Sequence, residues 1–220
     1  MAYELYWISG SPYAWRAQLA LEIKGLDYVS RRLDPADRTH KSPEYLAMNP
    51  RGKVPVLRDG DVTVYESLAI LAYLESKHAE PPLFGRAAVE TAFIWQRVFE
   101  LENYVRPAIF GMAVPFFAGQ AAEKAEEIKT FAADSHTELK PIEDALSRAD
   151  YLAGQTVSAA DVVFVPILQS LLRALGKDEA APLDLGFLPL DKTYPRIAAW
   201  MSRIEAIPGY DKTYRPHWRD

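Results

Sequence analysis

The fold is decided by residues 3–33, YELYWISGSPYAWRAQLALEIKGLDYVSRRL. The first six of them, Tyr3 to Ile8, are rich in aromatic and branched side chains, which favours a β-strand. Ser11 followed by Pro12 predicts the start of a helix, with a capping hydroxyl and then a proline at the first helical position. A second strand is expected at Leu26 to Leu33. Together these elements predict a β–α–β unit.

The residues that follow extend this unit to a small α/β domain. Ser42-Pro43 predicts a short second helix by the same cap-and-proline pattern. Val54 to Leu57 and Val62 to Tyr65 are expected to be strands, and Asp59-Gly60 between them is typical of a tight hairpin. Ser67 is expected to cap a third helix. The order of elements is therefore β–α–β–α–β–β–α.

The rest of the chain is expected to be helical throughout. Long helical patterns are expected at 87–117, 120–148, 158–175 and 194–207. Pro107 and Pro115 fall inside the first of them and are expected to kink or break it. Residues after Gly209 form a basic and aromatic tail. The sequence thus predicts an α/β domain followed by an all-α domain.

The composition narrows the class of protein. The 220 residues include 25 Lys and Arg against 30 Asp and Glu, a net charge of −5, so the basic surface of a nucleic-acid-binding protein is not expected. The absence of cysteine excludes disulfides, thiolate metal ligands and cysteine nucleophiles. The four histidines lack the spacing of metal ligands, and we expect no metal.

The chain also lacks the sequence features of membrane insertion and export. No run of about 18 apolar residues occurs, so no membrane-spanning helix is expected. The N-terminus has neither the basic region nor the apolar region of a signal peptide. A cytoplasmic protein is the default expectation.

Four motifs resemble those of glutathione S-transferases, in the same order and at similar separations over nearly the whole chain. They are Ser11-Pro12-Tyr13-Ala14-Trp15-Arg16, Asn49-Pro50-Arg51-Gly52-Lys53-Val54-Pro55-Val56-Leu57, Glu66-Ser67-Leu68-Ala69-Ile70 and Ser158-Ala159-Ala160-Asp161. The resemblance implies a thioredoxin-like, glutathione-binding domain over residues 1–78, a linker over 79–86 and an all-helical domain over 87–220. The last motif is a capping box with Asp in the place of Glu, and we assign it a folding role.

The resemblance implies where glutathione binds. Members of the family have a cis proline at the position of Pro55, which exposes the backbone of Val54 for pairing with the extended tripeptide. Ser67 at a helix start suits the γ-glutamyl carboxylate, and Glu66 suits the γ-glutamyl ammonium. The candidates for the glycine carboxylate are the basic residues Lys53, His40 and Lys41.

Ser11 is the residue expected to stabilise the glutathione thiolate. A free thiol has a pKa near 8.5, and both a hydroxyl donor and the positive end of a helix favour its ionised form. Ser9, Tyr6 and Tyr13 remain alternatives for this hydroxyl. The Ser-Pro-x-x-Trp-Arg setting resembles serine-type members, especially the zeta class. Pro12 and Tyr13 replace a Ser and a Cys of the zeta pattern, which argues against zeta-type maleylacetoacetate isomerisation.

The helical domain is expected to hold the second, electrophilic substrate. The expected pocket residues are apolar or aromatic: Tyr13, Tyr104, Phe110, Met112, Phe116 and Phe117. A mostly apolar pocket suits a hydrophobic electrophile. The function implied is therefore glutathione transfer to such an electrophile, a detoxification reaction, in a homodimer. Glutathione-dependent isomerisation, disulfide reduction and non-catalytic ligand binding or assembly are the alternatives.

Overall fold

The computed structural model describes residues 2–214. They form two compact units, one made of residues 2–83 together with 205–214 and the other of residues 84–204. The first unit contains the sheet, and the second is all-helical. The expected class, a thioredoxin-like domain followed by a helical domain, is confirmed.

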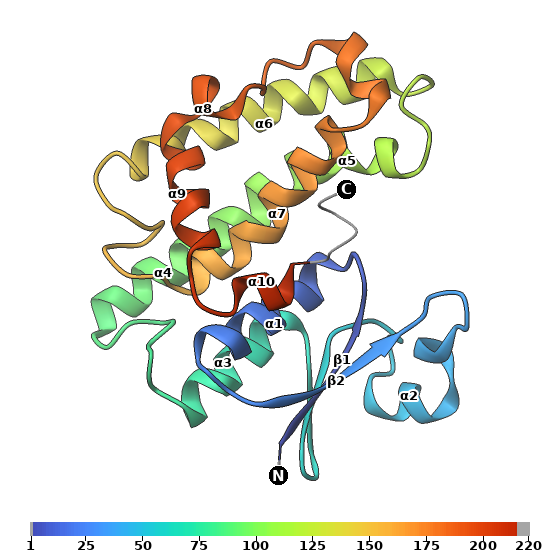
Figure 1. The fold of residues 1–220 in the computed structure, drawn as a ribbon, viewed down its shortest axis with the longest axis vertical. Helices are drawn as coiled ribbons and strands as arrows, with labels where there is room; N and C mark the ends of the chain where they lie inside the picture. Colours follow the sequence, from blue (N-terminus) through green and yellow to red (C-terminus); the bar gives the residue numbers. More distant parts are fainter. Residues whose placement is uncertain (1, 215–220) are drawn as a thin grey trace. The chain divides into compact units, whose positions relative to one another are not determined.

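The first unit has the expected order of elements (Figure 1). Its strands and helices are β1 (Tyr3–Ile8), α1 (Pro12–Ile23), β2 (Tyr28–Leu33), the 3-10 turn η1 (Thr39–Lys41), α2 (Pro43–Met48), β3 (Val56–Asp59), β4 (Val62–Tyr65), α3 (Ser67–Lys77) and, from the end of the chain, α10 (Tyr210–Thr213). Both predicted helix starts have their predicted chemistry, since Ser11 and Ser42 each accept a hydrogen bond from a backbone N–H of the first turn.

The sheet is mixed, with the strand order β2-β1-β3-β4. β2 runs parallel to β1, whereas β3 is antiparallel to both β1 and β4. In this register Val56 of β3 lies between Tyr6 of β1 and Tyr65 of β4. The alternate residues Tyr3, Leu5 and Trp7 of β1 are buried. Helices α1 and α3 cover one face of the sheet (Figure 1). Tyr6, on the other face, contacts Tyr45 of α2.

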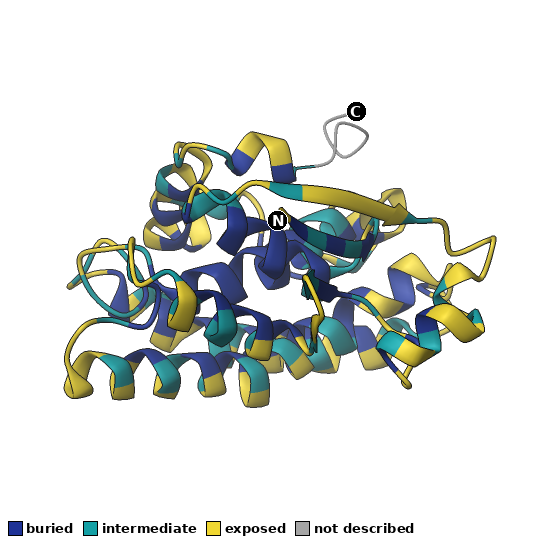
Figure 2. Ribbon diagram, turned by 90° about the horizontal axis from the view of Figure 1, so that it is seen from below, coloured by how far each residue is buried: buried dark blue, intermediate teal, exposed yellow. Residues whose placement is uncertain are grey.

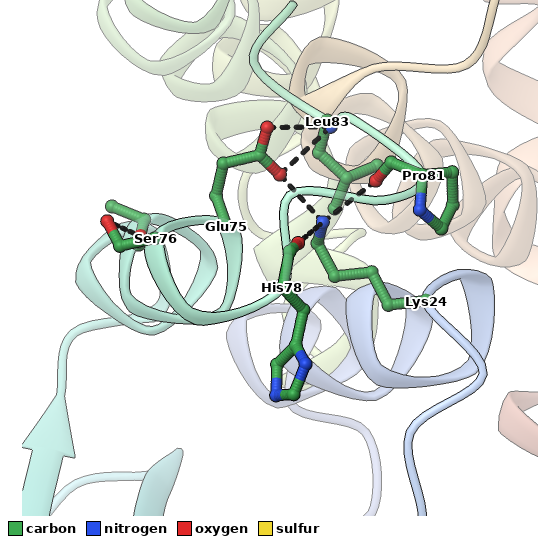
Figure 3. A network of polar contacts seen from close by, with 7 residues as sticks. Lys24, Glu75, Ser76, His78, Pro81 and Leu83 are labelled. Carbon is green, nitrogen blue, oxygen red and sulfur yellow. Dashed lines mark hydrogen bonds and ion pairs between the residues drawn. The ribbon is translucent and has the colours of Figure 1, made fainter.

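A buried lysine ties the end of α3 to the end of α1 (Figure 3). The Lys24 ammonium lies 2.7 Å from Glu75 Oε2 and donates to the carbonyls of His78 and Pro81, at 2.7 and 2.8 Å. Glu75 also accepts from the backbone N–H of Leu83. The Lys24 side chain is 0% exposed. Burial of a charge is tolerated here because each of its donors has an acceptor.

The second unit is built from long helices. They are α4 (Ala88–Glu100), the π-helical turn η2 (Leu101–Val105), α5 (Arg106–Phe117), α6 (Ala125–Ala145), α7 (Ala159–Leu175), the 3-10 helix η3 (Asp178–Leu183), α8 (Leu190–Thr193) and α9 (Pro195–Glu205). The first eleven residues of α7 are all buried, so α7 forms the centre of this core, and both α4 and α5 pack against it. Buried and exposed positions alternate along several of the helices (Figure 2).

The predicted break in the first long helix lies just before Pro107. The π-helical turn Leu101–Val105 ends α4, and Pro107 is the second residue of α5. A proline has no N–H and its ring collides with the carbonyl four residues earlier, which explains the irregular turn before it. Pro115 lies inside α5 near its end and does not break it. The helix expected at 120–148 is shorter, Ala125–Ala145.

Asp161 holds the capping box of α7 together. Its Oδ2 accepts from the backbone N–H and the hydroxyl of Ser158, both at 2.8 Å. Its Oδ1 accepts from the N–H of Leu152 at 2.9 Å and from the indole of Trp200 at 2.8 Å. Burial raises the pKa of Asp161, while these four donors oppose that shift. The folding role expected for this motif has a direct structural basis.

The C-terminal end of the chain departs from the expected domain division. Residues 205–214, which the sequence assigns to the helical domain, belong to the first unit. The boundary between the units, at residues 83 and 84, falls inside the expected linker of residues 79–86. The physical reason is a set of contacts between α10 and α1, described below. Within residues 2–214, no helix combines the length and the apolarity needed to cross a membrane.

Candidate functional site

The topology brings three of the expected motifs to one edge of the sheet. Tyr6, Val56 and Tyr65 lie side by side on β1, β3 and β4. Because β3 is antiparallel to its two neighbours, the end of β1, the start of β3 and the end of β4 meet at this edge. Ser11 follows β1, Val54-Pro55 precedes β3, and Glu66-Ser67 follows β4. The residues expected to bind glutathione are thus gathered by the fold.

Ser11 is the N-cap of α1. Its Oγ accepts from the backbone N–H of Ala14 at 3.2 Å, and Pro12 is the first helical residue. No hydrogen bond recorded within residues 2–214 uses the hydroxyl hydrogen of Ser11, so it can be donated to a ligand. The first turn of α1 contains no acidic side chain that would offset the positive end of the helix. Both features favour an anion beside Ser11.

The loop before β3 presents the backbone of Val54. The Val54-Pro55 bond is cis. The carbonyl of Lys53 accepts from Tyr45 Oη and Asn49 Nδ2, both at 2.8 Å. Burial raises the pKa of Tyr45, so its hydroxyl stays protonated and donates. Neither the N–H nor the carbonyl of Val54 takes part in a strand pair or a turn hydrogen bond among the described residues, so both are available to a bound backbone.

Glu66 and Ser67 differ from the expectation in their helical positions. The N-cap of α3 is Glu66, and Ser67, expected to be the cap, is the first helical residue. Glu66 has φ 71° and ψ 118°, a conformation that costs a residue with a side chain about 1–3 kcal/mol. Ser67 is buried. Among the residues described, its hydroxyl makes no hydrogen bond. The N-terminus of α3 therefore keeps unused donors beside a strained carboxylate residue.

The three basic candidates are placed differently. The Lys41 ammonium already donates to the carbonyl of Gly52 at 2.7 Å and to that of Arg51 at 3.3 Å, so it braces the loop before Lys53. The Nδ1 atom of His40 is buried and has no partner within the described part of the chain. The side chain of Lys53 is exposed. Lys53 is thus open to a carboxylate, His40 has a buried ring nitrogen without a partner among the described residues, and Lys41 has a structural role.

The alternatives to Ser11 lie in distinct surroundings. The Ser9 hydroxyl is buried with no partner among residues 2–214. Tyr6 has its ring edge-on to Tyr45, with centroids 6.2 Å apart. The Arg16 guanidinium lies over the ring of Tyr13 at 5.0 Å. Ser11 is the one among these residues that caps a helix.

The six residues expected for the second substrate divide by exposure. Met112 and Phe116 are 0% and 3% exposed, so they fill the core of the helical unit and offer no surface to a substrate. Their burial argues against the expected role of these two residues. Tyr104 and Phe117 are 58% and 43% exposed, and Phe110 is half-buried. Tyr13 is half-buried in the first unit.

Sequence reasoning missed two residues that shape the site. Tyr45 and Asn49 fix the carbonyl of Lys53 and so orient the loop that presents Val54. The available signal was Asn49 directly before Pro50, since a short amide side chain next to a proline commonly bonds to nearby backbone. Within residues 2–214 no group of three His, Asp or Glu side chains could hold a metal.

Comparison with known proteins gives the family. Residues 5–82 match the model of the glutathione S-transferase N-terminal domain, and residues 105–208 match that of the C-terminal domain. Glutathione S-transferase 4 of Zea mays is 33% identical over 222 residues, which cover 96% of this chain and 91% of the maize protein. The chain belongs to the glutathione S-transferase family.

Solved structures of other glutathione S-transferases agree with this assignment. The enzyme of the Antarctic clam Laternula elliptica has a TM-score of 0.85 and 31% identity, covering 100% of this chain and 95% of the clam chain. A glutathione S-transferase-I solved with lactoylglutathione has a TM-score of 0.79 and 27% identity, covering 97% and 98%. The family, the fold and the expectation of a glutathione transferase enzyme are confirmed.

Proposed function

We propose that this glutathione transferase ionises glutathione at Ser11 and directs the thiolate at a hydrophobic electrophile. The observation that carries the proposal is the meeting of Ser11, Val54 and Glu66-Ser67 at one edge of the sheet. In this arrangement the backbone of Val54 pairs with the tripeptide as a short added strand. The N-terminus of α3, with Ser67, binds the γ-glutamyl carboxylate, and Glu66 binds the γ-glutamyl ammonium. His40 and Lys53 bind the glycine carboxylate.

The chemistry assigned to Ser11 is thiolate stabilisation. A hydrogen bond to a charged group contributes about 1.5–3 kcal/mol and a helix N-terminus about 0.3–1 kcal/mol. At about 1.4 kcal/mol per pKa unit, the two together lower the thiol pKa from near 8.5 to about 6.5. The thiolate sulfur then forms a bond to an electrophilic carbon, and the leaving group departs with the electron pair of the broken bond.

The second substrate is assigned to the helical unit, at its exposed aromatic side chains. Tyr104, Phe110 and Phe117 are at least partly exposed, whereas Met112 and Phe116 are buried. In this proposal the first unit binds glutathione, and the helical unit selects the electrophile. A similar structure holds lactoylglutathione, an S-substituted glutathione, which supports a product of this kind.

A homodimer is part of the proposal. Exposed apolar side chains lie along α4, with Val89, Phe93 and Phe99 at 65%, 59% and 53% exposure. An apolar surface of this kind is typical of an interface between subunits. Light scattering is expected to give about twice the chain mass of 24.8 kDa, and a value near 24.8 kDa at micromolar concentration would contradict the dimer. A cytoplasmic, detoxifying enzyme is the setting we propose.

Conjugation kinetics test the transferase assignment. Wild type is mixed with glutathione and an activated aryl chloride, and the thioether product is followed by absorbance from pH 6 to 9. Ser11→Ala is expected to lose about tenfold or more in kcat at pH 6.5 with a much smaller change in the KM for glutathione, because ionisation rather than binding is impaired. Ser9→Ala, Tyr6→Phe and Tyr13→Phe serve as matched variants.

Each outcome selects one reading of the site. A loss confined to one of the three matched variants moves the role to that hydroxyl. Wild type that binds glutathione but forms no thioether favours the non-catalytic module, and product formed only from a disulfide or an isomerisable double bond favours the reductase or the isomerase. The relatives described above are glutathione S-transferases and give these alternatives no support.

A further inference from the structure

The end of the described chain lies along α1, the helix that begins at Ser11. Residues 209–214, which we term the C-terminal clasp, include α10 and belong to the first compact unit. Figure 1 shows α10 beside α1. The two helices are separated by almost the whole sequence, yet they are packed together. The clasp therefore fixes the position of α1 from outside the β–α–β unit.

One end of the clasp is held at the last turn of α1. A Cβ atom on Gly209 would lie 2.8 Å from Glu22, and the φ of Gly209 is 90°. Glycine is thus required both for the backbone conformation and for the close approach. The Lys212 ammonium lies 3.1 Å from Glu22 Oε2. These contacts anchor the clasp but do not reach the catalytic end of the helix.

The other end of the clasp is held at the first turn of α1. The indole N–H of Trp15 donates to Thr213 Oγ1 at 2.8 Å, and the Thr213 hydroxyl donates to the carbonyl of Tyr210 at 2.7 Å. Thr213 is 0% exposed and Trp15 is 3% exposed. The rings of Tyr210 and Tyr214 contact Trp15, with centroids at 6.3 and 5.6 Å. The Trp15 side chain is therefore oriented by the clasp.

Trp15 is also the residue that closes the turn of Ser11. Its backbone N–H donates to the Ser11 carbonyl at 3.1 Å, and the N–H of Ala14, one residue earlier, donates to Ser11 Oγ. The first turn of a helix is prone to fraying because few bonds hold each residue. Because Thr213 fixes the side chain of Trp15, the last residue of this first turn, it restricts the motion of the turn.

We propose that Thr213 is a positioning residue for Ser11: through Trp15, the C-terminal clasp holds the first turn of α1 in the conformation that presents the Ser11 hydroxyl to the glutathione sulfur. The inference rests on the proposed function of Ser11 and adds to it a dependence on the far end of the chain. Thr213 acts through Trp15 and is not a catalytic residue itself.

The test compares Thr213→Val with Thr213→Ser and Tyr3→Phe. Val has the shape of Thr and offers no acceptor to the indole, whereas Ser restores it. Tyr3→Phe removes another part-buried hydrogen bond of the same unit, the one between Tyr3 Oη and His78 Nε2 at the opposite end of β1, and is the control for general destabilisation. The pKa of glutathione bound to each purified protein is read from thiolate absorbance across pH.

Thr213→Val is expected to raise the bound thiol pKa by at least about half a unit, toward the free value near 8.5. Thr213→Ser and Tyr3→Phe are expected to leave it within about 0.2 units of wild type. Equal pKa values for Thr213→Val and wild type, or an equal rise in Tyr3→Phe, would overturn the inference. If Thr213→Val does not fold, Thr213→Ala takes its place with the same expected rise, since Ala also offers no side-chain acceptor to the indole.

Amide hydrogen exchange separates this inference from the proposed function. In the ligand-free protein, Thr213→Val is expected to speed exchange of the Ala14 and Trp15 amides about tenfold, a change of about 1.4 kcal/mol in local opening. Unchanged exchange would contradict the clasp even if glutathione is ionised normally. If exchange of these amides is faster in Thr213→Val but wild type does not bind glutathione, the clasp does stabilise the first turn of α1, whereas the proposed role of Ser11 is refuted.

Discussion

Replacing Lys24 with Met tests how much the buried ammonium contributes to stability. The Lys24 side chain is fully buried and its ammonium contacts Glu75 and the carbonyls of His78 and Pro81, at 2.7 to 2.8 Å (Figure 3). Met fills nearly the same volume but removes the ammonium that donates to these three acceptors. Breaking a buried ion pair typically costs 3–5 kcal/mol, and we take about 3 kcal/mol because Glu75 keeps the N–H of Leu83.

Urea denaturation followed by circular dichroism measures this cost. With an m-value of about 3 kcal/mol/M for a chain of this size, Lys24→Met is expected to lower the midpoint by about 1 M. Lys77→Met is the matched control, since Lys77 also pairs with a carboxylate, Asp59, but its side chain is 44% exposed. The control is expected to shift the midpoint far less. If the two variants lower the urea midpoint by the same amount, burial is not the reason why the Lys24 contacts stabilise the protein.

Three further perturbations follow from the structure. Asp161→Asn replaces one carboxylate oxygen, which accepts two hydrogen bonds, with an NH2 group that faces the same two donors. Thermal unfolding is expected to show that the free energy of unfolding falls by about 3 kcal/mol. A fall of less than about 1 kcal/mol would contradict the four-donor geometry. Glu66→Gly relieves the φ of 71°, so the melting temperature is expected to rise while the KM for glutathione increases about tenfold; an unchanged KM would remove Glu66 from the site. Hydrogen bonds from Lys77 and then Tyr73 lower the pKa of Asp59. The stability difference between wild type and Lys77→Met is therefore expected at neutral pH and is expected to shrink as the pH falls through that lowered pKa. A difference that grows on acidification would contradict this.

Much of the first unit follows from its sequence because the signals are local. Ser11-Pro12 and Ser42-Pro43 each begin a helix at the residue expected, and the Asp59-Gly60 turn joins the strands expected. The position of Ser67 was wrong by one residue. The cap is Glu66 in a backbone conformation that residues with side chains rarely adopt, and no propensity predicts such an outlier.

The features that depend on distant contacts could not be predicted. Thr213 and Trp15 are 198 residues apart, and nothing local to either marks the other as its partner. The pocket residues of α5 show a second limit. This helix is apolar almost throughout, so helical spacing could not separate the buried Met112 and Phe116 from the exposed Phe117.

The measurement that tests the central claim most directly is the ionisation of bound glutathione in wild type and Ser11→Ala. Thiolate absorbance of the saturated complexes is recorded from pH 5 to 9. The account predicts a thiol pKa near 6.5 in wild type and near 8 in Ser11→Ala, because the hydroxyl contributes about 1.5–3 kcal/mol and the helix end alone remains. A thiol pKa in Ser11→Ala equal to that of wild type would contradict the role of Ser11.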